Sequence, residues 1–161
     1  MLLKILIFTI GMLLAGCSTK ALVTTHSSLP AVNTNNKISL FELNNYTDTP
    51  RAGMRAANIV EGILHTKGYA VQTHFKQNLY TRQEAQQQAI KDGSSYFLIG
   101  GVSEWRYKTG IDGEPAVSLQ LTLYTTKDKR VLWSATGADN DWGNASIGST
   151  AQTLIEKMMK K

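Results

Sequence analysis

Residues 96–135 carry the pattern that most constrains the fold of this chain. From Val117 to Tyr124, apolar and polar side chains alternate one by one, as in a strand with one buried face and one open face. Similar segments flank it, and turn-forming sequences separate the three. The predicted strands are 96–107, 117–124 and 131–135, with turns at 110–115 and 127–130. This order predicts an antiparallel meander.

The remaining segments indicate helices that can cover such a sheet. Thr49 and Pro50 offer an N-cap followed by proline at the first helical position, and the apolar stripe that follows ends near Gly68. Thr81 and Glu84 match a capping box and begin a second helix. The other predicted elements are strands at 38–41 and 69–73 and a helix at 147–158. The order βαβαβββα predicts one α+β domain, residues 37–161, in which helices cover a mixed sheet.

The first sixteen residues read as a signal peptide. Lys4 precedes an almost unbroken apolar run that is too short to span a membrane comfortably. The following residues, 14–17 with sequence Leu-Ala-Gly-Cys, look like the lipobox of bacterial lipoproteins. In that pattern Cys17 is lipidated, the signal is removed before it, and Ser18 favours the outer membrane. A signal peptide with a coincidental cysteine and a buried N-terminal helix are the alternatives.

Residues 17–36 are rich in Ser, Thr and Asn and show no apolar periodicity. This composition predicts a flexible tether between the lipid anchor and the domain. The mature protein would then be a short lipidated linker followed by one periplasmic domain on the inner side of the outer membrane.

Composition argues against several classes of function. The single cysteine excludes an internal disulfide and a thiol-based zinc site. His26, His65 and His74 are too scattered to indicate a metal site. We find no phosphate-binding loop and no nucleophile elbow, so we expect neither an enzyme nor a cofactor. The net charge of +5 is weak support for binding a polyanion, and we do not expect a nucleic-acid partner.

The meander separates charges along the sheet. In three antiparallel strands, the first turn and the exit from the third strand share one end. Carboxylates gather at that end, and basic side chains lie at the other. The acidic set is Asp112, Glu114, Asp139 and Asp141, and the basic set is Lys127, Lys129 and Arg130. These are either ordinary solvated turns or, in a ring of identical subunits, a rim of carboxylates facing a cationic ligand.

Trp142 lies in the exit loop between Asp141 and Gly143, an unusual setting for a core tryptophan. It either packs under the last helix or projects toward lipid headgroups. Trp105 and Trp133 lie within predicted strands and are expected to pack against helices or neighbouring subunits.

Three segments together resemble the PelC family, the small outer-membrane lipoproteins of the Pel exopolysaccharide export system. They are residues 41–53, 110–115, and 131–134 through 141–143. Other lipoprotein folds, of the curli-secretion and TolB N-terminal types, share this strand order. The basic total charge departs from the uniformly negative surface that the resemblance would suggest.

The resemblance implies a ring-forming periplasmic lipoprotein, a dodecamer in that family, beneath an outer-membrane pore protein, PelB. Such a ring would guide a cationic, partly deacetylated amino-sugar polymer toward the pore. By this analogy Cys17 carries the lipid, Asp112 with Glu114 guides the polysaccharide, and Trp142 contacts the membrane. The alternative function is a periplasmic adaptor lipoprotein that binds a secretion-pore or envelope-synthesis protein.

Overall fold

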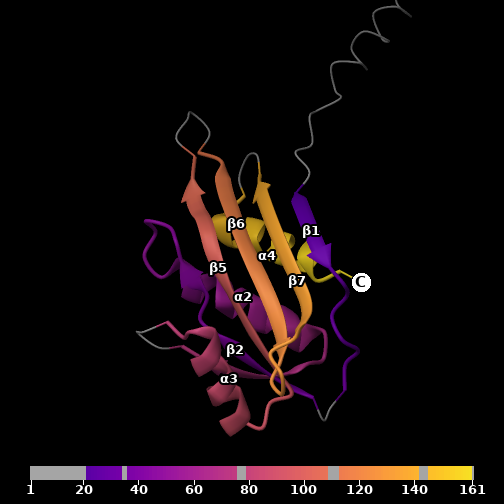
Figure 1. The fold of residues 1–161 in the computed structure, drawn as a ribbon. Coiled ribbons are helices and arrows are strands. Elements are labelled where there is room, and N and C mark those ends of the chain that lie inside the picture. The colour runs from indigo at the N-terminus through magenta and orange to yellow at the C-terminus, as the bar shows by residue number, and fades with distance from the viewer. Residues whose placement is uncertain (1–20, 34–35, 76–78, 109–112, 142–144, 161) are drawn as a thin grey trace, which may run out of the picture.

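The computed structural model describes residues 21–33, 36–75, 79–108, 113–141 and 145–160. Within these residues, seven strands form one mixed sheet in the order β1-β7-β6-β5-β2-β4, and β3 pairs with β5 beside this path (Figure 1). The strands are β1 Leu22–His26, β2 Lys37–Phe41, β3 Asn44–Asn45, β4 Ala70–His74, β5 Tyr96–Tyr107, β6 Pro115–Thr125 and β7 Val131–Asn140. The predicted α+β class and the antiparallel meander of β5, β6 and β7 are confirmed.

Three helices accompany the sheet in the described part of the chain. They are α2 Ala52–Thr66, α3 Arg82–Lys91 and α4 Ile147–Met158. Helices α2 and α4 lie on one face of the sheet, and α3 lies on the other face, near β2 (Figure 1). The capping box predicted at the start of α3 is present, because Thr81 and Glu84 each accept a hydrogen bond from the other's backbone N–H. None of these helices has the length and apolar character that crossing a membrane requires.

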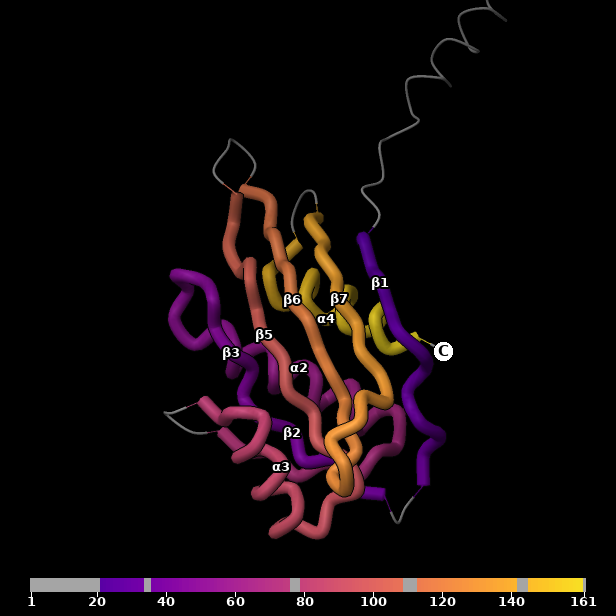
Figure 2. Tube along the Cα trace, in the orientation of Figure 1, coloured from indigo at the N-terminus to yellow at the C-terminus, as the bar shows by residue number. Residues whose placement is uncertain are grey.

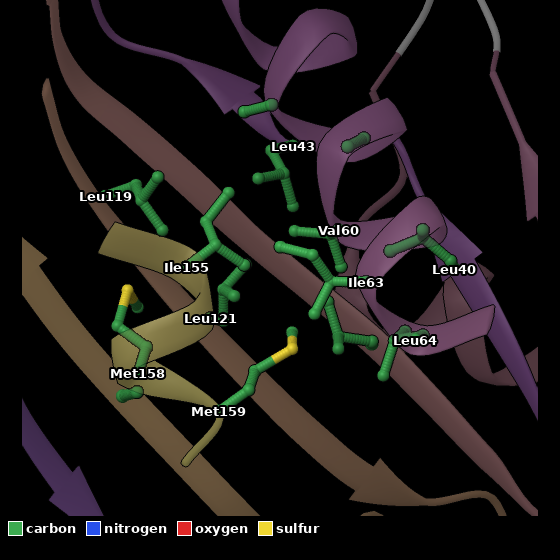
Figure 3. Close-up of a cluster of buried hydrophobic side chains, with 14 of the residues drawn as sticks. Leu40, Leu43, Val60, Ile63, Leu64, Leu119, Leu121, Ile155, Met158 and Met159 are labelled. Carbon is green, nitrogen blue, oxygen red and sulfur yellow. The ribbon is translucent and has the colours of Figure 1, made fainter. Parts of the chain in front are cut away.

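The main core lies between the sheet and the pair α2 and α4. Ile63 of α2 and Ile155 of α4 meet over Leu121 of β6 (Figure 3), and all three are buried. Burying one such side chain contributes roughly 1.5–3 kcal/mol. Trp105 and Trp133 belong to this core, with only 3% and 1% of their surfaces exposed. The meander is therefore a rigid platform whose ends can present side chains at fixed positions.

A smaller apolar cluster lies under α3 on the opposite face. Phe97 and Tyr124 stack there with ring centroids 5.0 Å apart, and Ala85 and Ala89 of α3 cover them. Because α3 is short, the rest of this face over β5, β6 and β7 has no described helix against it (Figure 1).

The structure departs from the flexible tether predicted for residues 17–36, because residues 22–26 of this segment form a strand. Leu22–His26 form β1, which pairs antiparallel with β7 along the edge of the sheet (Figure 2). Leu29 is buried in the main core, and Pro30 accepts a hydrogen bond from the Tyr69 hydroxyl at 2.5 Å. The domain thus begins before residue 37, because a polar, β-branched segment gained backbone hydrogen bonds from an edge strand that was otherwise unpaired.

The predicted N-cap of the first helix is also wrong. Helix α2 begins at Ala52, after Arg51, whose φ of 60° lies in the left-handed region, and no side chain caps it. The Thr49 hydroxyl instead donates a hydrogen bond to the backbone carbonyl of Trp105 at 2.5 Å. This contact fixes the loop before α2 to β5, and it forms part of the groove described below.

Candidate functional site

The register of the meander brings the predicted acidic residues to one end of the sheet. Pro115 pairs with Tyr107, and Asn140 pairs with Ala116, so the turn that precedes β6 and the exit from β7 lie together. Glu114, Asp139 and Asp141 mark this end, which we call the Glu114 end. Asp112 and Trp142, predicted for the same end, and Cys17 lie outside the described residues.

The basic turn lies at the opposite end, as predicted. Thr125 and Arg130 close it through a backbone hydrogen bond of 2.9 Å. Asp128 offsets part of its charge, because this carboxylate lies 4.0 Å from the Arg130 guanidinium. The hydrogen bond from the Thr125 hydroxyl, with one from the backbone of Arg130, lowers the pKa of the Asp128 carboxyl.

The Glu114 end is less negative than the count of carboxylates predicts. The Lys108 Nζ atom lies 3.7 Å from Glu114 Oε2, and the Lys157 Nζ atom lies 3.4 Å from Asp139 Oδ2. The Asp139 side chain is also largely buried, with 8% of its surface exposed. Two of the three described carboxylates at this end, Glu114 and Asp139, therefore each have a lysine beside them, which reduces the negative charge of the end within one subunit.

The first residues of the domain lie at this same end. Leu22 pairs with Ala138, two residues before the end of β7. Five residues of extended chain reach at most about 18 Å, which is the limit on how far Cys17 can lie from Leu22. The sequence could not show this relationship, because the strand character of β1 was not predicted.

A polar cluster connects β2, β4 and α3 on the α3 side. Asp92 Oδ2 lies 2.6 Å from His74 Nε2 and accepts a hydrogen bond of 2.5 Å from Ser39. Burial favours a higher pKa for the Asp92 carboxyl, but hydrogen bonds from Ser39, Gln88 and His74 outweigh it and lower that pKa. Ser39 and His74 both form hydrogen bonds to Asp92. A catalytic triad also needs a hydrogen bond between the serine and the histidine, and these two described residues do not form one.

The cluster connects β2, β4 and the end of α3 through hydrogen bonds to Asp92. Its members come from three segments far apart in the sequence. Among the described residues, no group of three or more His, Cys, Asp and Glu side chains is arranged to hold a metal ion.

A groove of about 400 Å³ lies between residues 46–49 and the ends of β5 and β6. Its lining includes the exposed ring of Tyr46 and the carboxylates of Asp48 and Glu104. Sequence reasoning missed these residues because two separate segments contribute them, and the strand pairing of β3 with β5 brings the segments together.

Comparison with known proteins places this fold in a family. No protein-family model matches the chain, and no curated protein does. Among solved structures, the PelC dodecamer from Paraburkholderia phytofirmans has a TM-score of 0.74 and 33% sequence identity, over 86% of this chain and 94% of its own. A point variant of that protein, also a dodecamer, has a TM-score of 0.74 and 35% identity, over 85% and 95%. The chain belongs to the PelC family.

The resemblance carried by residues 41–53, 110–115 and 131–143 is thus confirmed as family membership, and the PelC fold accounts for nearly the whole described domain. A Xanthomonas campestris protein has a TM-score of 0.50 and 13% identity, over 83% of this chain and 85% of its own. At that identity the likeness shows the fold alone.

Proposed function

We propose that this PelC-family chain is a lipoprotein on the periplasmic face of the outer membrane. It assembles as a homo-oligomeric ring and guides a cationic exopolysaccharide to an export pore of the PelB type. The chain acts by electrostatic attraction and does not catalyse a reaction. The polymer must be released as it moves, so its contacts with the ring are weak and repeated.

The observation that carries this proposal is the position of β1. Because Leu22 lies at the Glu114 end, a lipid on Cys17 holds that end within about 18 Å of the membrane. The exit loop with Trp142 follows β7 at the same end. A tryptophan there can lodge among lipid headgroups beside the anchor, since its ring is apolar and its N–H is polar.

The ring is supported by the solved PelC relatives, which are dodecamers. In such a ring each charge at the Glu114 end is repeated around one rim, and a rim of like charges focuses a field on an oppositely charged ligand. Lys108 offsets the charge of Glu114 within a subunit. The carboxylate of Asp112 is therefore the one to which we give the main guiding role.

The experiment compares polymer secretion by cells that carry Asp112→Asn or Glu114→Gln in the full-length lipoprotein. We expect Asp112→Asn to reduce secretion strongly and Glu114→Gln to reduce it less, because Lys108 already compensates Glu114. Membrane fractionation and the mass of the detergent-solubilised oligomer show that anchoring and assembly are intact. Normal secretion with Asp112→Asn, or a monomeric wild-type protein, would contradict the proposal.

The membrane contact has its own test. In a Cys17→Ala background, which removes the lipid site, we expect Trp142→Ala to shift the protein from vesicles into solution. Equal vesicle binding with and without the tryptophan would exclude Trp142 as a membrane contact.

A further inference from the structure

The sheet face that α2 and α4 leave open carries a row of polar side chains. Cross-strand partners share a face, and on this face Glu104 pairs with Ser118, and Ile99 pairs with Thr122. Gln120 lies between them on β6 and is exposed. Hydroxyl and amide groups are thus spaced along β6, two residues apart, and the Glu104 carboxylate lies beside Ser118 on β5.

A rigid loop forms one side of this face. The Tyr46 backbone N–H donates to the Val102 carbonyl at 2.9 Å, and the Asn45 side chain donates to the Thr49 carbonyl at 2.8 Å. The Thr49 hydroxyl in turn is bonded to Trp105 of β5. Residues 45–49 are therefore held to β5 at both ends, and little conformational entropy is lost if a ligand binds against them.

Tyr46 is fixed in this loop with its ring exposed. Its ring rests against Gly101, where an added Cβ would lie 2.6 Å from Tyr46 Cε2. Its hydroxyl accepts a hydrogen bond of 2.9 Å from the Asn44 side chain. Nevertheless 66% of the tyrosine surface remains exposed. A flat aromatic ring held in this way offers a surface on which the C–H face of a sugar ring, or an ammonium group, can pack.

Two cavities lie near this tyrosine: Tyr46 itself lines the first, and Asn44, which donates to its hydroxyl, lines the second. The groove of about 400 Å³ contains Asp48, Glu104, Arg106 and Ser118. The second cavity, of about 140 Å³, is lined by residues that include Glu42, Arg82, Gln120 and Thr122. The two follow one another along β6, since Ser118, Gln120 and Thr122 are successive residues of the open face. Together they can accept an extended chain of several units.

The charges along these cavities suit an amino sugar. Arg106 Nη2 lies 3.0 Å from Glu104 Oε1, which neutralises that carboxylate. The Arg82 guanidinium lies over the Tyr124 ring, 5.1 Å from its centroid. The carboxylates of Asp48 and Glu42, by contrast, have no hydrogen bond or ion pair with another described residue. One available carboxylate in each cavity can receive an ammonium group, and the neighbouring Ser, Thr and Gln side chains can bond to hydroxyl and acetamide groups.

We propose that these two cavities and Tyr46 form one saccharide-binding groove for a partly N-acetylated amino-sugar polymer. This site lies on the open face of the sheet, and its larger cavity begins beside the Glu114 end, because Arg106 pairs with Ala116 near the ends of β5 and β6. The proposal rests on the proposed function for the class of polymer. In this proposal each subunit also holds the polymer by aromatic stacking and hydrogen bonds, in addition to the electrostatic attraction from the carboxylates at the Glu114 end.

The experiment measures binding of short oligosaccharides to the full-length protein in detergent, by saturation-transfer NMR and calorimetry. The probes are oligomers of glucosamine, oligomers of N-acetylglucosamine, and galacturonate oligomers as an anionic control. We expect both amino-sugar probes to bind and galacturonate to bind at least tenfold more weakly. Tyr46→Ala should weaken the binding of both amino-sugar probes about tenfold. Ile90→Ala, which removes an exposed apolar side chain of α3 outside the groove, should leave their binding unchanged.

Asp48→Asn gives a second readout that does not depend on the tyrosine. It should weaken glucosamine oligomers severalfold, reduce their salt dependence, and leave N-acetylglucosamine oligomers unaffected. Unchanged binding in both Tyr46→Ala and Asp48→Asn would overturn the groove. Dissociation of the protein ring in Tyr46→Ala would also contradict the proposal, because it would identify this face as a contact between subunits.

These outcomes are distinguishable from failure of the proposed function. The groove is tested by binding of short oligomers, and the guiding role of the rim is tested by secretion with Asp112→Asn. If Asp112→Asn reduces secretion while Tyr46→Ala and Asp48→Asn both bind the oligosaccharides as well as the wild type does, the proposed function is retained and the groove is excluded.

Discussion

Lys157 Nζ lies 3.4 Å from Asp139 Oδ2, so the last turn of α4 places a positive charge against the end of β7. The carboxylate has 8% of its side chain exposed and the lysine 40%. Removing the lysine would therefore leave a mostly buried carboxylate without its ion-pair partner, which costs more than the loss of an exposed pair.

Lys157→Gln is expected to lower the free energy of unfolding by about 1 kcal/mol at low salt, and by less at high salt. Urea denaturation at two ionic strengths measures this. Lys160→Gln is the matched control, because Lys160 lies at the same end of α4 but is not paired with Asp139. Equal effects of the two substitutions would mean that the helix dipole, and not Asp139, accounts for the stabilisation.

The cluster of Asp92, His74 and Ser39 predicts a loss of stability in acid. The pKa of the folded Asp92 carboxyl is lower than its usual value of 3.8. The ionised group therefore contributes stability above that usual value, and the contribution is lost as pH falls through the lower pKa of the folded state. Asp92→Asn should cost about 1–3 kcal/mol at neutral pH and progressively less in acid.

Urea denaturation from neutral pH down to about pH 3 tests this expectation. Glu156→Gln, which removes an exposed carboxylate on α4, serves as the control and should keep the wild-type pH dependence. If the wild-type and Asp92→Asn profiles stay parallel throughout, the Asp92 carboxylate is not the group that responds to acid.

The strongly periodic segments were predictable because their pattern and their burial have the same cause. The alternation at 117–124 and the stripe of α4 each mark a face that the core covers. The position of the turns at the two ends of the sheet followed from antiparallel topology alone. The capping box of α3 was likewise local, since Thr81 and Glu84 satisfy each other within one turn.

What could not be predicted depends on partners far away in the sequence. The segment that forms β1 is mostly exposed and gains its structure from pairing with β7. The Thr49 side chain, predicted to cap α2, instead donates a hydrogen bond to a backbone carbonyl of β5. The lysines that offset Glu114 and Asp139 come from β5's end and from α4, so a count of charges along the turns overestimated the negative charge of that end.

Two glycines of α2 are expected to respond to alanine in opposite directions. A Cβ on Gly53 would lie 1.9 Å from the Leu43 carbonyl oxygen, which is backbone and cannot move aside. A Cβ on Gly62 would meet nothing within 4 Å. Gly53→Ala should therefore destabilise the protein by about 3 kcal/mol, whereas Gly62→Ala should stabilise it by about 0.5–1 kcal/mol through helix propensity.

Thermal or urea unfolding of the two variants checks the difference, and each acts as the control for the other because both replace a glycine of α2 by alanine. A similar small gain in both would mean that the Leu43 backbone and α2 can separate without cost. That result would also weaken the case for a rigid loop at residues 45–49, since Leu43 leads into that loop.

The segment before β2 gives the last prediction, because a tether and a folded edge respond differently to truncation of a leucine. Leu29 is 6% exposed and belongs to the main core, whereas Leu22 in β1 is 75% exposed. Leu29→Ala should cost about 2–4 kcal/mol of unfolding free energy, and Leu22→Ala should cost less than about 0.5 kcal/mol. Urea denaturation of the full-length protein in detergent measures both. If Leu29→Ala is as mild as Leu22→Ala, residues before β2 act as a tether after all, and the short reach between Cys17 and the Glu114 end no longer follows.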